Sequence, residues 1–146
     1  MRKGLIKAYF DKGLYEKAFR QINELGVYYP RSYDFYLYSG LYYALIGNID
    51  KAIESYNLAL SKGSDQYVYY NLSVCYEKLR DLEKAIAFAL ECYKINPSYL
   101  PGLIKLGDLY MQKEEVAEAR KYYQKALELD PQNKIIMDKI LKLRRG

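Results

Sequence analysis

Apolar and small residues recur along the chain with the period of a helix. In residues 100–131 they fall at i, i+3, i+4 and i+7, first as Leu103, Leu106, Gly107 and Tyr110. A second stretch with similar spacing contains Ala119, Tyr122, Tyr123, Ala126 and Leu127. Pro131 then ends it, because proline has no backbone N–H and disfavours helix in the residue before it. The pattern predicts two amphipathic helices that pack together.

This pattern recurs in four copies. Three series of residues share one register, in steps of 34, 33 and 34 positions: Tyr9, Tyr43, Tyr76 and Tyr110; Ala18, Ala52, Ala85 and Ala119; Pro30, Ser64, Pro97 and Pro131. A register held by three independent features predicts a stack of repeated units. Such stacks usually bind along a surface, and seldom catalyse at a point.

We expect one all-α domain over residues 1–146, a solenoid with repeats at about 1–32, 33–65, 66–99 and 100–133. A terminal helix is predicted at 134–145, and its residues that should face the stack are Ile136, Met137, Ile140 and Leu141. Its polar outer side would close that end. At the other end, Leu5, Ile6 and Phe10 are expected to have less cover than their equivalents. This predicts self-association there, unless the native chain continues upstream or that end meets another partner.

The repeat resembles the tetratricopeptide repeat, a 34-residue helix–turn–helix unit written W-x₂-L-G-x₂-Y…A-x₃-F…A…P. The fourth copy matches best, through Leu103 in the Trp place and then Leu106, Gly107, Tyr110, Ala119, Tyr123, Ala126 and Pro131. Gly107 and Ala119 would let the two helix backbones approach closely. The main departures are Tyr36 and Tyr69 in the Trp place and Ile6 in the Gly place.

In that family the first helices of successive repeats line a concave groove. Carried over to this sequence, the resemblance implies that the groove is lined by Lys3, Lys7, Leu37, Tyr38, Leu41, Tyr67, Tyr70, Asn71, Val74, Ile104, Lys105 and Asp108. Its centre would be apolar and aromatic, and its lysines would select acidic ends of a ligand. These properties predict a non-catalytic module that binds a peptide or helix of another protein. The alternative for the apolar positions is packing between adjacent helices.

Two other ligands are weighed against a peptide of this kind. Some family members hold an acidic C-terminus in a clamp of two Lys, two Asn and an Arg, whose places here are Lys3, Lys7, Tyr38, Tyr67 and Asn71. Only Lys3 matches, so we do not expect such a clamp. RNA-binding helical repeats read one base per repeat with a shared polar pair, and the groove positions carry no shared pair. RNA binding stays an alternative that the low net charge also disfavours.

The composition argues against an enzyme. The 146 residues include no His, which removes the commonest general base and metal ligand. The sequence also has no Gly-rich phosphate loop and no cluster of carboxylates, so we expect no cofactor, no metal and no small-molecule substrate. Cys75 and Cys92 lie on apolar helical faces, where free cysteines are small hydrophobes.

The net charge of +5 is concentrated at the two ends. Residues 1–32 contain seven Lys or Arg and three acids, and residues 134–146 contain five and one. These ends could meet nucleic acid or an acidic lipid surface, but solvated end faces that keep the stack from polymerising are the preferred explanation. No apolar run approaches the ~20 residues of a membrane span, and the start does not have the form of a signal peptide. A cytoplasmic location is predicted, or a periplasmic one if a leader has been removed.

Overall fold

The computed structural model describes residues 2–145, and this range contains nine helices and no strand. The helices are α1 (Arg2–Asp11), α2 (Tyr15–Tyr28), α3 (Tyr33–Leu45), α4 (Ile49–Leu60), α5 (Gln66–Lys78), α6 (Leu82–Ile95), α7 (Leu100–Gln112), α8 (Val116–Leu129) and α9 (Lys134–Arg145). Helices 1 to 8 pack as four successive pairs, and α9 packs against α8. The predicted all-α solenoid of four helix pairs with a terminal helix is confirmed.

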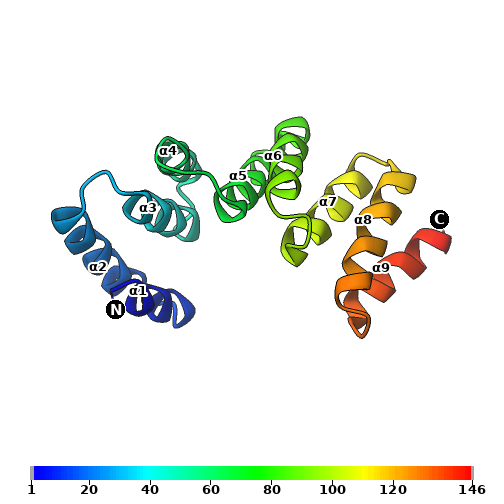
Figure 1. Ribbon diagram of the computed structural model, residues 1–146, viewed down its shortest axis with the longest axis horizontal. Coiled ribbons are helices and arrows are strands. Elements are labelled where there is room, and N and C mark those ends of the chain that lie inside the picture. The colour runs from blue at the N-terminus through cyan, green and yellow to red at the C-terminus, as the bar shows by residue number, and fades with distance from the viewer. Residues whose placement is uncertain (1, 146) are drawn as a thin grey trace.

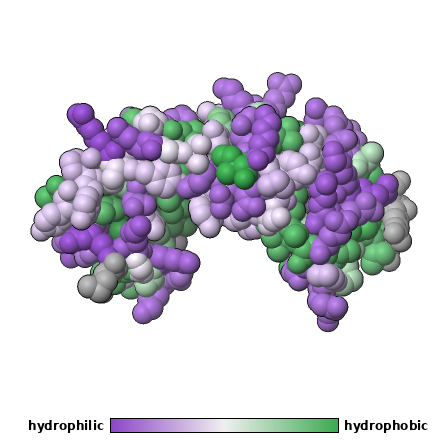
Figure 2. All heavy atoms as spheres, viewed as in Figure 1, coloured by the Kyte–Doolittle hydropathy of each residue, from purple (hydrophilic) through white to green (hydrophobic). Residues whose placement is uncertain are grey.

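The stack of pairs forms an arch. Helices α3, α5 and α7 lie along its inner side, whereas α4 and α6 lie along its outer side (Figure 1). The space-filling view shows that the arch is hollowed on the same inner side (Figure 2). Helices α3, α5 and α7 each contact the helix before them and the helix after them in the chain. The buried core therefore continues from pair to pair.

Small residues let the helices of the last three pairs cross closely, whereas the first pair has Ile6 at the same position. A Cβ atom added to Gly107 would lie 2.3 Å from the Tyr123 ring, and one added to Gly40 would lie 2.5 Å from the Tyr56 ring. Both contacts are shorter than any side chain tolerates, so glycine is required opposite each tyrosine. In the third pair the equivalent position is Ser73, which is fully buried and donates a hydrogen bond to the carbonyl of Ala85 at 2.7 Å.

The turn inside each pair repeats in the same register. The turn has three residues, and its middle residue has a positive φ in every copy, namely Gly13 (71°), Gly47 (86°), Arg80 (62°) and Glu114 (64°). Glycine adopts this conformation freely, whereas other residues do so at a cost. The residue that follows caps the second helix in two copies, where Asn48 accepts from Lys51 N and Asp81 accepts from Lys84 N. Leu14 makes no such bond at the start of α2.

The prediction that the apolar residues of the first repeat are poorly covered is wrong for Ile6 and Phe10. Ile6 is 0% exposed and belongs to a core cluster with Ile22, Leu25 and Tyr42, and Phe10 packs against that cluster. The reason is that Ile6 stands at the small-residue crossing position, where α2 and α3 both cover it. Only Leu5 is exposed, at 40%, so the premise of the predicted self-association fails for two of its three residues.

The predicted face of the terminal helix is also partly wrong. Ile136 and Ile140 are buried as expected, and Leu143 joins them, but Leu141 is 47% exposed. Leu141 stands one repeat after Gly107, at the position that meets the second helix of a pair. No helix of the described range packs on that side of α9, so its apolar contact runs at i, i+4 and i+7 instead.

Candidate functional site

The residues predicted to line the groove lie on α1, α3, α5 and α7, of which the last three form the inner side of the arch (Figure 1). Lys3, Lys7 and Tyr67 are exposed, and the other nine are half-buried: Leu37, Tyr38, Leu41, Tyr70, Asn71, Val74, Ile104, Lys105 and Asp108. None of the twelve is fully buried, so each could still touch a ligand. Their surroundings nevertheless divide them into three groups.

The first group packs between repeats. Leu37 and Leu41 contact the core cluster around Tyr56 and Leu72, and Ile104 contacts the cluster of the last two pairs. Tyr38 packs in the same way against the cluster of the first repeat. Burial raises the pKa of Tyr38, and the charge of Asp34 adds to this effect. These side chains therefore serve mainly as inter-repeat packing, the alternative left open for the apolar positions.

The second group is aromatic and includes a residue that the sequence did not single out. The rings of Tyr67 and Tyr70 both stand nearly perpendicular to the ring of Tyr99, at 89° and 83°, with centroids 5.5 and 5.8 Å away. We call these three residues the tyrosine cluster. Tyr99 precedes α7 and joins α5 to the next repeat, so its place could have been found from the register of the turn before each first helix.

Asn71 lies beside the cluster on α5. Its Nδ2 atom donates to the carbonyl oxygen of Tyr67 at 2.8 Å. One of the two amide hydrogens is therefore used inside the helix, and the other remains able to donate to a ligand. The Oδ1 atom has no partner among residues 2–145 and can accept a hydrogen bond.

The third group is charged, and two of its three lysines, Lys3 and Lys105, are already paired with carboxylates of the neighbouring first helix, as is Lys139 of α9. Lys3 Nζ lies 3.2 Å from Asp34, Lys105 Nζ 2.6 Å from Glu77, and Lys139 Nζ 2.7 Å from Asp108. The hydrogen bond and charge of Asp34 raise the pKa of Lys3. These pairs link α1 to α3, α5 to α7, and α7 to α9.

We call this series of ion pairs between first helices the ladder, and two further polar contacts strengthen it. Glu77 also accepts from Gln112 Nε2 at 2.6 Å, and the Tyr33 hydroxyl donates to Asp65 between the second and third repeats. The prediction that Lys3 and Lys105 select acidic ligands did not foresee this compensation. Such a ligand would have to compete with a carboxylate that each lysine already contacts.

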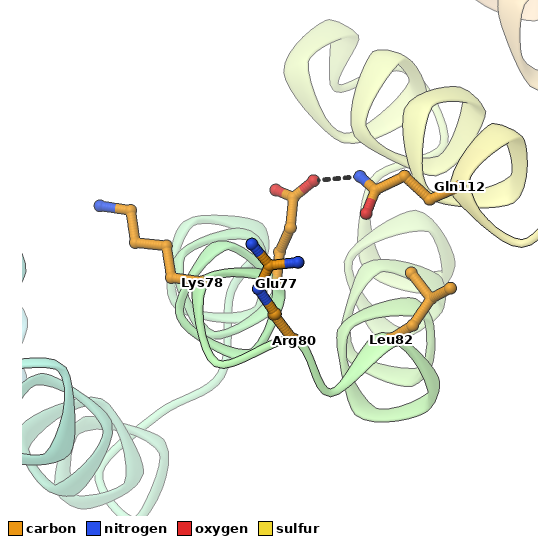
Figure 3. Close-up of a pocket in the computed structure, with 5 residues that line it drawn as sticks. All are labelled: Glu77, Lys78, Arg80, Leu82 and Gln112. Atoms are coloured by element: carbon orange, nitrogen blue, oxygen red, sulfur yellow. Dashed lines mark hydrogen bonds between the residues drawn. The ribbon is translucent and has the colours of Figure 1, made fainter.

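Two surface hollows lie away from the tyrosine cluster. One of about 520 Å³ is lined by Glu77, Lys78, Arg80, Leu82 and Gln112. In it Glu77 points toward Gln112 while Lys78 points away (Figure 3). Another, of about 580 Å³, lies near the start of the chain and is lined by Arg2, Lys3, Leu25, Tyr28, Tyr29, Ser32 and Asp34. Within residues 2–145 no group of three His, Cys, Asp or Glu side chains is placed to hold a metal ion.

The described helices form pairs that cross at small residues in the last three copies, and the inner face carries tyrosines and paired charges. These features define an α-solenoid built from helix–turn–helix repeats. The chain belongs to the tetratricopeptide repeat family, whose models match residues 3–67, 67–99 and 101–133. This membership confirms the family resemblance of the sequence.

The curated relatives are much longer proteins. Over 87 residues the chain is 41% identical to Heat shock protein STI1 of Saccharomyces cerevisiae, a match that covers 58% of this chain and 15% of the relative. It is 31% identical over 91 residues to the Hsp70-Hsp90 organizing protein of Triticum aestivum, covering 62% and 16%. These relatives are named as a heat-shock protein and as a protein that organises Hsp70 and Hsp90.

Solved structures share the fold at lower identity. The chain superimposes on Pseudomonas aeruginosa pilF with a TM-score of 0.90 and 21% identity, over 99% of this chain and 66% of that one. The first TPR of Spaghetti (RPAP3), bound to the HSP90 peptide SRMEEVD, gives 0.73 and 22%, over 77% and 93%. As for membranes, none of the helices in the described range is both long and apolar enough to span one.

Proposed function

We propose that this chain is a non-catalytic interaction module that binds a peptide or helix of a partner protein along the inner side of the arch. The observation that carries the proposal is the tyrosine cluster, which lies on α5 and just before α7 and contributes to none of the three core clusters. The side chain of Tyr67, one of its three members, is 49% exposed. Tyrosine suits such a role because it offers a large rigid contact area and a polar tip at modest entropy cost.

The named relatives support a protein partner. They include organising proteins of chaperones, and one structural neighbour of the same fold is bound to a chaperone peptide. That peptide, SRMEEVD, is acidic. The inner face of this chain suits an acidic tail poorly, since Tyr38 and Tyr67 stand in two polar places of the clamp and Lys3 is paired with Asp34. We therefore take from the relatives a protein partner and not this particular ligand.

A cytoplasmic setting, expected from the sequence, is compatible with the two thiols. Cys75 and Cys92 are both unpaired and buried. Burial raises the pKa of each thiol to about 11, so both stay protonated and inert at neutral pH. Neither cysteine supplies a nucleophile or a metal ligand to the proposed function.

The experiment is capture of partners by the intact protein, followed by mass spectrometry and by hydrogen–deuterium exchange of the complex. We expect one protein partner to be retained, and protection on binding at α5 and at the start of α7. Protection confined to α4 and α6, or to the basic ends, would refute the inner side as the binding surface. Recovery of RNA that nuclease treatment releases together with the partner would favour the RNA-binding alternative instead.

A further inference from the structure

We infer that the tyrosine cluster binds a proline-rich, uncharged segment in an extended polyproline II conformation. This inference rests on the proposed function and specifies the class of its partner. Grooves lined by aromatic rings recognise such segments because the ligand is already ordered and loses little entropy on binding. Three properties of the cluster favour this ligand over an acidic tail or an amphipathic helix.

The first property is the arrangement of the rings. Tyr67 and Tyr70 lie one turn apart on α5, and both are fixed against the single ring of Tyr99. Neither is stacked face to face on it, since the planes stand at 89° and 83°. The three side chains are therefore held in place by one another while ring surface stays open, as the 49% exposure of Tyr67 shows. Prolyl rings pack well on such preorganised aromatic surface.

The second property is a surplus of hydrogen-bond donors. Within residues 2–145 none of the three hydroxyls of the cluster has a hydrogen-bond partner, whereas Tyr33 and Tyr123 donate to Asp65 and Asp108. A proline-rich segment has the complementary shortage, because its carbonyl groups are free and its prolines have no N–H. A helical ligand would satisfy its own carbonyls internally and leave the three donors unused.

The third property is charge compensation around the cluster. The nearest carboxylate, that of Asp65, accepts from the backbone N–H groups of Tyr67 and Val68 and from the Tyr33 hydroxyl. On the next first helix, Lys105 is paired with Glu77, and the two side chains are only 17% and 23% exposed. Because Asp65 and Lys105 are both engaged in these contacts, a charged segment would have to break them or leave part of its charge desolvated. An uncharged segment avoids that cost.

The test uses three labelled peptides: decaproline and an alternating Gly-Ser decapeptide, both with blocked ends, and the acidic sequence SRMEEVD with a free C-terminus. Fluorescence anisotropy with the full chain should show saturable binding of decaproline that changes little between low and high salt. We expect no comparable binding of the other two. Decaproline that binds no better than the Gly-Ser peptide, or SRMEEVD that binds more tightly than decaproline, would overturn the inference.

Variants locate the site. Tyr67→Ala should weaken decaproline binding by on the order of tenfold, and Tyr70→Phe by a smaller factor, since it removes only a donor. Tyr28→Ala is the matched control, because Tyr28 is 67% exposed on α2 and remote from the cluster. Equal effects of Tyr67→Ala and Tyr28→Ala would contradict the site. Thermal unfolding followed by circular dichroism shows that each variant is folded.

The outcome also separates this inference from the proposed function. If the natural partner is captured, and Tyr67→Ala abolishes that capture although decaproline does not bind, the module stands and the ligand class is wrong. If no protein partner depends on the inner side, the proposed function fails whatever decaproline does.

Discussion

At the scale of single residues, the same repeat position can carry opposite energetic consequences. Tyr56 and Tyr123 occupy equivalent places, and each ring packs on a glycine of the facing helix. The Tyr123 hydroxyl donates to Asp108, whereas the Tyr56 hydroxyl is buried without a partner. An unsatisfied buried polar group costs about 1–3 kcal/mol. The family pattern has Phe at this place, so Tyr56 departs from it at a cost.

This difference predicts opposite responses to one substitution. Tyr56→Phe removes only the unpaired hydroxyl and should raise the free energy of unfolding by roughly 1 kcal/mol. Tyr123→Phe removes a bonded hydroxyl, leaves Asp108 with Lys139 alone, and should lower it by about the same amount. Urea denaturation of both variants measures these two changes in the free energy of unfolding. A decrease for Tyr56→Phe would mean that its hydroxyl has a partner after all.

The buried thiols predict a response to alkaline pH. Burial raises the pKa of Cys75 and Cys92 from 9.0 to about 11, so the folded state keeps protons that the unfolded chain releases. Their contribution to stability is complete below pH 9 and is lost as the pH rises through the interval from 9 to 11. The free energy of unfolding should fall across this window, and iodoacetamide should label the native protein at pH 8 far more slowly than the unfolded protein. Equal labelling rates would refute the burial.

At the scale of the helix pair, the crossing tolerates little added volume. Ala85 is 0% exposed, and its carbonyl accepts a hydrogen bond from the equally buried Ser73 across the third pair. Ala85→Leu should overpack this crossing and cost roughly 1–3 kcal/mol. Ala87→Leu, on the exposed side of the same helix, is the control and should change stability by less than about 0.5 kcal/mol. Two variants that melt alike would show that the pair does not cross there.

The pairs themselves could be predicted from the sequence because their signals are local. Helical spacing of Leu106, Gly107 and Tyr110 and the chain break at Pro131 need no knowledge of other repeats. The exposed side of Leu141 could not be predicted in the same way. The residues at its repeat position, Ile6, Gly40, Ser73 and Gly107, are all buried under a second helix, and only the packing of α9 shows that none in the described range covers Leu141.

The candidate site was less accessible to sequence reasoning, since side-chain pairing depends on how neighbouring repeats are placed. Lys139 and Asp108 lie 31 residues apart, and Lys105 and Glu77 lie 28 apart. These separations are one repeat less one or two helical turns, so they join successive first helices. Without that geometry the lysines looked free to bind an acidic ligand. Tyr99 was missed because it precedes its helix and falls outside the groove positions of the family.

At the scale of the whole molecule, the ladder of ion pairs ties successive inner helices together. Glu77 contacts both Lys105 and Gln112 of α7, with little exposure of either charged side chain. Glu77→Gln should leave Lys105 without its counter-charge and cost about 1 kcal/mol. Glu91→Gln breaks the exposed pair with Lys94 inside α6 and should cost next to nothing. Urea denaturation of the two variants side by side tests whether the tie between α5 and α7 stabilises the arch.

The central claim is that tyrosines of the inner face divide into those that hold the fold and those that bind a partner. Tyr76 is of the first kind, since its ring stacks on Phe88 at 5.4 Å and 10° and contacts two core clusters. Tyr70 is of the second kind, and touches Tyr99 in the tyrosine cluster.

The most direct test therefore measures two quantities for Tyr70→Ala and Tyr76→Ala: the affinity for the partner and the free energy of unfolding. Tyr70→Ala should weaken binding of the captured partner by on the order of 2 kcal/mol and leave the chain nearly as stable as the parent. Tyr76→Ala should lower the free energy of unfolding by about 3 kcal/mol. If Tyr70→Ala unfolds the protein as badly as Tyr76→Ala, or keeps full affinity while folded, the claim is contradicted.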